Sequence, residues 1–268
     1  MNKVLLLSLP FKKGYQRNGR CDFVSWCGCQ WWPVILGQLG AYLEQHGQLV
    51  KLIDAQAWGW DEYKTGREIK ILKPTHVIIY AGNESFESDL LFAKQLKCLR
   101  YNVALAGPFY AMEKNMKLAE AEGITGIHGQ LERGVMDWIL DRVIAGSSWR
   151  GEDLRSEDVD ELPFVSEFMI RHTETQHYAA PSEPYPFIDI MTSRGCVWGK
   201  CTYCVWPQKY SPNYTEMSIN RVLAELLWIQ NHSDYKHVMF QDDLMRNGRL
   251  EAISRGMIKH NIKLSWSA

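Results

Sequence analysis

The sequence has no excess charge of either sign and no long apolar run. Its 268 residues carry 30 Lys and Arg against 31 Asp and Glu, which gives a formal net charge of −1. This balance gives no reason to expect a polyanionic partner such as nucleic acid. No apolar stretch approaches the roughly 18 residues that span a bilayer. The apolar stretch that follows Met1 is too short for a signal peptide, and no small-residue cleavage site follows it. We therefore expect no nucleic-acid partner and no membrane partner.

The sequence also has no internal repeats and no low-complexity tract, and its cysteines cannot all form disulfide pairs within the chain. The 7 cysteines are odd in number, which argues against a fully paired disulfide framework. Free or metal-bound thiols suit the reducing cytoplasm, where clustered cysteines are more often metal ligands than disulfide bridges. We therefore predict a cytoplasmic protein. Apolar residues at 46% and charged residues at 23% are typical of a globular chain. The length allows one large or two ordinary domains.

Short apolar runs alternate with amphipathic stretches over the first 145 residues. Near-continuous leucine and β-branched runs predict strands buried on both faces of a parallel sheet, at residues 4–9, 49–53, 76–80, 103–107 and 124–127. Helical spacing between them predicts helices at residues 33–46, 85–99 (capped by Ser85) and 130–144. This alternation predicts an α/β fold, with a Rossmann-like, doubly wound parallel sheet over residues 1–145.

The pattern breaks at residues 146–186, which are polar, acidic and interrupted by prolines, and we interpret this stretch as a linker. A second α/β pattern follows over residues 187–268. It contains predicted strands at 187–192, 237–240 and 262–266, a helix capped by Ser218 and a helix from Leu250. Three strands and two helices make the first half of a β/α barrel. Because a half barrel leaves sheet edges open, we expect a fragment; the alternatives are that another chain or a different topology covers the exposed edge.

Three cysteines follow the first strand of this second pattern with the spacing C-x4-C-x2-C: Cys196, Cys201 and Cys204. Three thiolates are too few to close a tetrahedral zinc site, but they can hold a four-iron, four-sulfur cluster with one iron left open. A loop at the carboxyl end of a strand is also where β/α folds build active sites. Gly195 and Gly199 permit the unusual dihedral angles of a chain that wraps a cluster.

Two other interpretations of these cysteines stay open. One is a zinc site that recruits a fourth ligand, such as His172 or His177 upstream, and the other is a set of buried, inert thiols. Arg194 and Lys200 favour the cluster because they add positive charge beside anionic thiolates.

The run from Thr192 to Cys196, followed by Cys201-Thr-Tyr-Cys204, resembles the cluster loop of radical S-adenosylmethionine enzymes. It is most similar to the branch that carries an N-terminal cobalamin-binding domain. The usual spacing there is C-x3-C-x2-C, so this chain has one additional residue. The resemblance implies that Cys196, Cys201 and Cys204 ligate a [4Fe-4S] cluster. It also implies that S-adenosylmethionine binds the open iron and yields a 5′-deoxyadenosyl radical, and that Tyr203 packs against the adenine.

Polar residues at the ends of later strands are further candidates. Asp242 and Asp243 follow the predicted strand 237–240, where position favours function, although a helix N-cap beside a solvated neighbour explains them equally well. The resemblance implies that one of them contacts the amino group of S-adenosylmethionine. Ser265, near the end of the third strand, is a weaker candidate for the same cofactor. No catalytic residue is assigned.

The resemblance makes cobalamin a candidate cofactor of the first domain. Residues 106–108 and 128–132 stand where the branch has a glycine pair and a Gly-Glu-x-Glu motif, although both matches are imperfect. The D-x-H-x-x-G signature is absent, so cobalamin would bind without a lower histidine ligand. The alternative is a degenerate domain that only packs against the barrel.

A second group of cysteines, Cys21, Cys27 and Cys29, lies in the first domain. Related methylthiotransferases carry an N-terminal cluster, but their cysteines are spread along the domain. We therefore favour a glycine-bearing loop near the cobalamin or the substrate over a second cluster.

The resemblance as a whole implies a radical S-adenosylmethionine enzyme. With cobalamin bound, methylation at an unactivated carbon is the leading reaction and ring rearrangement the second. The expected partners are a small-molecule or peptide substrate and an electron donor such as flavodoxin or ferredoxin. The alternatives are a non-catalytic cofactor-binding fragment and a zinc-stabilised binding module.

Overall fold

The N-terminal half of the chain forms a six-stranded parallel sheet. The computed structural model describes residues 2–18, 22–204 and 213–268. The strands of the first sheet are β1 (Lys3–Ser8), β4 (Leu49–Asp54), β5 (His76–Tyr80), β6 (Asn102–Ala106), β7 (Thr125–His128) and β8 (Ser148–Arg150). Their order is β4-β1-β5-β6-β7-β8, and each neighbouring pair is parallel. The predicted Rossmann-like α/β fold is confirmed.

The first sheet is buried on both faces, as its apolar runs predict. In β1, Val4 and Leu6 join the core on one face, while Leu5 and Leu7 join the core on the other. The period of two along a strand produces this division. The predicted strands of this domain coincide with β1, β4, β5, β6 and β7 to within one residue at each end.

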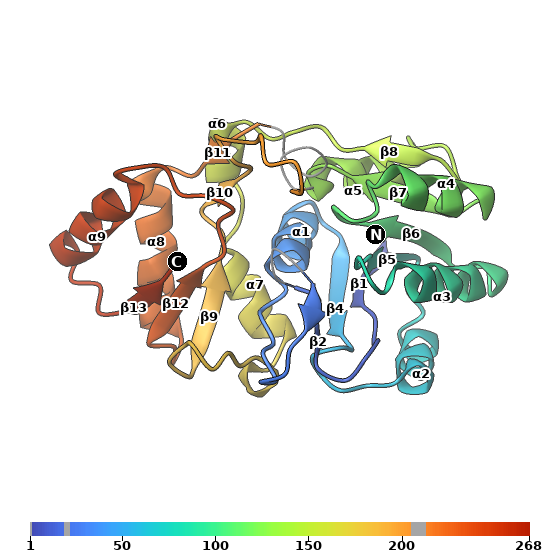
Figure 1. The fold of residues 1–268 in the computed structure, drawn as a ribbon, viewed down its shortest axis with the longest axis horizontal. Helices are drawn as coiled ribbons and strands as arrows, with labels where there is room; N and C mark the ends of the chain where they lie inside the picture. Colours follow the sequence, from blue (N-terminus) through green and yellow to red (C-terminus); the bar gives the residue numbers. More distant parts are fainter. Residues whose placement is uncertain (1, 19–21, 205–212) are drawn as a thin grey trace.

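Helices cover both faces of the first sheet (Figure 1). On one face lie α1 (Val34–Gln45) and α5 (Leu131–Ile139), and on the other lie α2 (Glu62–Leu72), α3 (Phe86–Cys98) and α4 (Glu113–Ala121). Ser85 is the N-cap residue of α3 as predicted, but its hydroxyl donates to Asp89 (2.8 Å) and accepts no hydrogen bond from the first backbone N–H groups of the helix.

The C-terminal part of the chain forms a second parallel sheet with the order β13-β12-β9. Its strands are β9 (Phe187–Ile190), β12 (His237–Phe240) and β13 (Ser265–Ser267), and its helices are α8 (Ile219–His232) and α9 (Arg249–Lys259). The Ser218 hydroxyl accepts a hydrogen bond from the backbone N–H of Arg221 (3.2 Å), which confirms the predicted cap of α8. A short antiparallel pair, β10 (Ser193–Arg194) with β11 (Thr215–Glu216), stands at the carboxyl end of β9.

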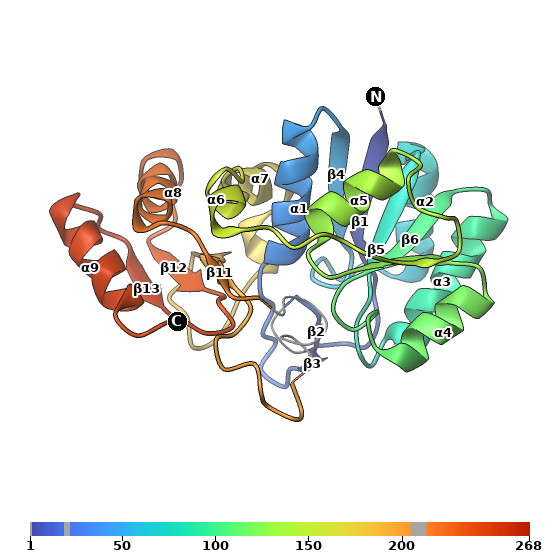
Figure 2. The same cartoon turned by 90° about the horizontal axis from the view of Figure 1, so that it is seen from above.

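The segment between the two sheets is more regular than a linker. It contains α6 (Ser156–Asp160), α7 (Val165–His172) and the 3-10 helix η1 (Thr175–His177). The first sheet also continues past the predicted boundary at residue 145, because β8 ends at Arg150. Helix α7 packs against α1 and β9 and lies between the sheets in Figures 1 and 2. One continuous core therefore joins both lobes.

Strand β9 is covered by a segment of the first lobe, which follows the small hairpin of β2 (Tyr15–Gln16) and β3 (Phe23–Val24). The buried Trp32 indole donates to the carbonyl oxygen of Phe187 (2.9 Å) and stacks on Tyr178 at 4.4 Å. The first lobe thus covers part of β9, an edge strand of the second sheet. None of the helices in the described ranges is long and apolar enough to cross a membrane.

Candidate functional site

The cysteine loop leaves the carboxyl end of β9, at the position that the sequence predicts. Gly195 and Gly199 adopt positive φ angles of 76° and 55°, so both glycines serve the turns expected of them. The loop's cysteines are free and half-buried, and the Cys204 N–H donates to the Cys201 carbonyl oxygen at 3.2 Å. The loop can therefore present thiols to a ligand without first breaking a disulfide.

The base of the loop is held by carboxylates from the end of β12. One oxygen of Asp242 accepts from the backbone N–H groups of Thr192 (2.6 Å) and Ser193 (2.7 Å), and the other accepts from the Thr192 hydroxyl (2.6 Å). Asp243 accepts from the Gly195 N–H at 3.1 Å. Burial raises the pKa of Asp242, and the donated hydrogen bonds oppose that rise. Both aspartates therefore fix the backbone that leads into Cys196.

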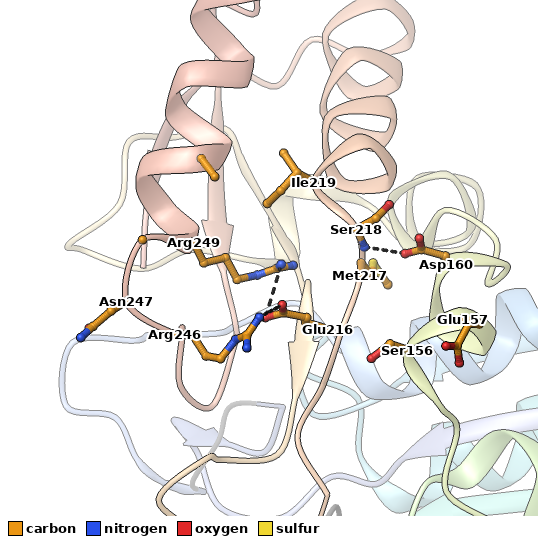
Figure 3. Close-up of a pocket in the computed structure, with 12 residues that line it drawn as sticks. Ser156, Glu157, Asp160, Glu216, Met217, Ser218, Ile219, Arg246, Asn247 and Arg249 are labelled. Carbon is orange, nitrogen blue, oxygen red and sulfur yellow. Dashed lines mark hydrogen bonds and ion pairs between the residues drawn. The ribbon is translucent and has the colours of Figure 1, made fainter.

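An arginine from α9 completes this base and borders an adjacent cavity. Arg249 is buried and donates to the carbonyl oxygen of Thr192 at 2.9 Å, and it lies 3.6 Å from Glu216. Figure 3 shows the guanidinium pointing toward Glu216, which also pairs with Arg246. The cavity has a volume of about 650 Å³ and lies between α6 and the first turns of α8 and α9. A space large enough for a small molecule thus adjoins the loop base.

Three of the exposed side chains of the loop are apolar or aromatic, and Lys200 and Thr202 are exposed beside them. Val197, Trp198 and Tyr203 are 56%, 61% and 87% exposed. Tyr203 lies beside Cys201, which raises the pKa of the phenol through a hydrogen bond. Solvent-exposed apolar side chains beside thiols are typical of a surface that a ligand covers.

The donor set fits an iron–sulfur cluster by its chemistry, since three thiols of one loop are the ligands that such clusters use. Within residues 2–18, 22–204 and 213–268, no group of three or more His, Cys, Asp or Glu side chains is arranged to hold a metal ion. That arrangement concerns a single metal ion, whereas the three thiolates of a [4Fe-4S] cluster bind three different irons and need not meet at one point. His172, a candidate fourth ligand in the zinc alternative, contacts Glu44 of α1 at 2.9 Å.

The N-terminal lobe also places residues against the second sheet. Asp189 of β9 is fully buried, and one of its oxygens accepts from the Trp32 N–H (3.0 Å) and the Gln241 amide (2.9 Å). Its other oxygen has no hydrogen-bond partner in the described residues. Burial raises the pKa of Asp189 to about 8 and that of the nearby Cys29 thiol to about 12. Both groups are therefore protonated at neutral pH, which sequence reasoning did not predict.

Two other predicted residues of the first cysteine group give little support to a second cluster. Cys29 is buried, whereas Cys27 is exposed and lies 3.5 Å from the Ser25 hydroxyl. Cys21 lies outside the described residues.

Ser265 does not join the other predicted site residues. It begins β13 and pairs with His237, the first residue of β12. Its hydroxyl contacts the His237 ring at 2.8 Å, at the opposite end of the sheet from Asp242. The sequence misled because β13 starts three residues later than predicted, so Ser265 opens the strand instead of ending it.

The carboxyl edge of the first sheet is partly filled by the chain itself. Doubly wound sheets bind ligands where the strand order reverses, which here is between β1 and β5. At that point the buried Arg17 pairs with Asp89 (2.7 Å) and donates to the carbonyl oxygens of Leu9 (2.9 Å) and Tyr80 (3.0 Å). The residues at this crevice therefore do not fit a large ligand. The loops after β6 and β7, with Gly107 at φ 116° and Gly129 at φ 74°, border the remaining edge.

The described residues thus form an α/β protein, with a Rossmann-like parallel sheet followed by a smaller parallel β/α sheet that carries the cysteine loop. Comparison with solved structures agrees. The cobalamin-dependent S-adenosylmethionine radical enzyme OxsB, with aqua-cobalamin and S-adenosylmethionine bound, superposes with a TM-score of 0.67 at 16% identity, over 99% of this chain and 38% of that chain. OxsB with aqua-cobalamin alone gives a TM-score of 0.66 at 15% identity.

The sequence comparisons are weaker. No family model matches the chain. The uncharacterized methyltransferase PH0819 of Pyrococcus horikoshii is 25% identical over 258 residues, which cover 88% of this chain and 54% of that relative. The chain thus spans about half the length of the curated relative that it matches. Both comparison proteins are named as enzymes, and the likeness to OxsB establishes the fold.

Proposed function

We propose that this chain carries the cluster-binding part of a radical S-adenosylmethionine enzyme, with Cys196, Cys201 and Cys204 as ligands of a [4Fe-4S] cluster. The observation that carries the proposal is the position of the C-x4-C-x2-C loop. It leaves the carboxyl end of β9, and its base is fixed by Asp242 and Asp243. The resemblance of the fold to OxsB supports the same assignment.

When bound, such a cluster supplies the electron that cleaves S-adenosylmethionine to a 5′-deoxyadenosyl radical. The chain's own residues position the loop and the cofactor. We assign the contact with the cofactor's amino group to Asp243, because it is more exposed than Asp242 and follows the same strand. Tyr203 presents an exposed ring on which the adenine can pack.

The reaction that we propose is methyl transfer to a small-molecule or peptide substrate, with the electron coming from a flavodoxin or ferredoxin. The name of PH0819 as a methyltransferase and the cobalamin dependence of OxsB support it. Because Arg17 fills the crevice between β1 and β5, we place a cobalamin at the backbone of the loops that contain Gly107 and Gly129.

Anaerobic reconstitution tests the cluster assignment. The protein is incubated with iron and sulfide, desalted and analysed for metals, beside a variant in which all three loop cysteines are replaced by Ala. A variant with Cys98→Ala, a free cysteine on α3, is the matched control. We expect about four irons and four sulfides per chain in the unaltered protein and in the control, and none in the triple variant. About one zinc per chain and no iron would support the zinc-stabilised module instead.

A further inference from the structure

Arg194 stands two residues before Cys196, and it is bound by the other lobe. Its guanidinium makes a two-pronged ion pair with Glu132, at 2.5 Å and 3.1 Å, and also donates to the side-chain oxygen of Gln130 at 3.2 Å. Both side chains of the ion pair are only 3% exposed. The positive charge of Arg194, which the sequence suggested would face the cluster, is therefore compensated by Glu132.

The partners of Arg194 are themselves fixed in the first lobe. Gln130 is the N-cap residue of α5, and its side-chain oxygen also accepts from the Leu154 N–H at 3.0 Å. Glu132 lies in the first turn of α5, where the helix dipole stabilises a carboxylate. The loop that holds them follows β7 and contains Gly129, so it belongs to the carboxyl edge of the first sheet. An edge that binds ligands in this class of fold thus contacts the cysteine loop directly.

A buried ion pair of this kind contributes more to geometry than to net stability. Removing two charges from water offsets most of their attraction, whereas losing one partner leaves an uncompensated buried charge. The planar guanidinium also fixes direction, because both of its prongs must meet one carboxylate. The base of the cysteine loop is therefore held from two sides, by Asp242 and Asp243 of its own sheet and by Glu132 of the first lobe.

We infer that Glu132 is a positioning residue for the cysteine loop, through which the first lobe sets the geometry of the cluster site. This inference rests on the proposed function. A ligand at the carboxyl edge of the first sheet would act on the cysteine loop through this ion pair.

The test uses Glu132→Gln, with Arg133→Gln as the matched control. Arg133 is the next residue of α5, but its ion pairs are to Glu152 (2.8 Å) and Asp158 (3.2 Å) and not to the cysteine loop. The first readout is hydrogen exchange of the amides of Ser193 and Gly195 in the metal-free protein, because these amides donate to Asp242 and Asp243. We expect exchange at least about tenfold faster in Glu132→Gln, and unchanged rates in Arg133→Gln.

The second readout is the electron paramagnetic resonance spectrum of the reduced, reconstituted protein with S-adenosylmethionine. We expect Glu132→Gln to shift or broaden this spectrum and Glu132→Asp, which keeps the charge, to restore it. If Glu132→Gln does not fold, Arg194→Lys replaces it, since it keeps the charge and loses the two-pronged contact. Exchange rates and spectra identical to those of the unaltered protein would overturn the inference. Failure of the unaltered protein to bind iron would instead overturn the proposed function, and the exchange rates would still decide this inference.

Discussion

The substitution Asp242→Asn removes the central acceptor of the loop base. The carboxylate accepts three hydrogen bonds, from the Thr192 N–H (2.6 Å), the Thr192 hydroxyl (2.6 Å) and the Ser193 N–H (2.7 Å). An asparagine keeps one oxygen, which can still accept from both backbone N–H groups, and replaces the other with an amide donor. The Thr192 hydroxyl then faces this donor as well as Arg249, which already donates to it at 3.1 Å.

The expected cost follows from these contacts. Hydrogen bonds to a charged group contribute about 1.5–3 kcal/mol each, and neutral ones about 0.5–1.5 kcal/mol. Losing one charged hydrogen bond and weakening two others should lower the free energy of unfolding by about 2–4 kcal/mol. Asp243→Asn is the matched control, because that residue is less buried and its bond to the Gly195 N–H is 3.1 Å long; it should cost less than Asp242→Asn.

Urea unfolding followed by circular dichroism measures both variants, with the slope of the transition compared to exclude a change in the unfolded state. In Asp242→Asn we also expect faster amide exchange at Ser193, because its acceptor is weakened. A value for Asp242→Asn within about 0.5 kcal/mol of the unaltered protein would refute the view that this carboxylate holds the loop base.

Other substitutions test other parts of the structure. Asp189 binds a proton in the native state up to a pKa of about 8, far above its ordinary value of 3.8, so the native state holds more protons than the unfolded state between these values. The stability of the unaltered protein relative to Asp189→Asn should therefore fall by up to about 1.4 kcal/mol per pH unit as pH rises from 5 to about 8; a flat difference in urea unfolding would contradict this. Trp32→Ala should lower the free energy of unfolding by about 3–5 kcal/mol in the same assay, because it leaves a cavity at a fully buried position and removes the indole hydrogen bond to the Phe187 carbonyl oxygen. Trp32→Phe should lower it less, because the phenyl ring fills most of the cavity. Ser265→Ala should leave S-adenosylmethionine binding by the reconstituted protein unchanged in calorimetry, since Ser265 lies at the far end of its sheet; a tenfold weaker binding would return it to the site.

The strands of the first sheet were predictable because burial on both faces leaves a nearly unbroken apolar run, as in Leu5, Leu6 and Leu7. Helices α2 and α4 were missed because each buries few residues: Thr65 and Ile69 in α2, and Asn115 and Ala119 in α4. Strand β8 has only the three residues Ser148–Arg150 and no run to detect, so the first domain was ended too early.

The location of the cysteine loop was predictable, because a strand signal precedes it directly. The contacts that hold the loop were not, since they join residues far apart in the sequence. Glu132 pairs with Arg194 across 62 positions, and Asp242 reaches Thr192 across 50. Asp242 was recognised by its place after a strand, but only the fold shows that its oxygens bind the loop backbone. For the ion pair with Arg194, the sequence offered one signal, which is the position of the charged Glu132 beside a predicted helix start.

The most direct test of the central claim is whether S-adenosylmethionine binds an open iron at the cysteine loop. The measurement is electron paramagnetic resonance of the reduced, reconstituted protein with and without S-adenosylmethionine. The cluster proposal predicts a signal that shifts when the cofactor is added and that is lost in Cys201→Ala. A spectrum that is the same with and without the cofactor would contradict the claim that the three cysteines leave one iron open for chemistry.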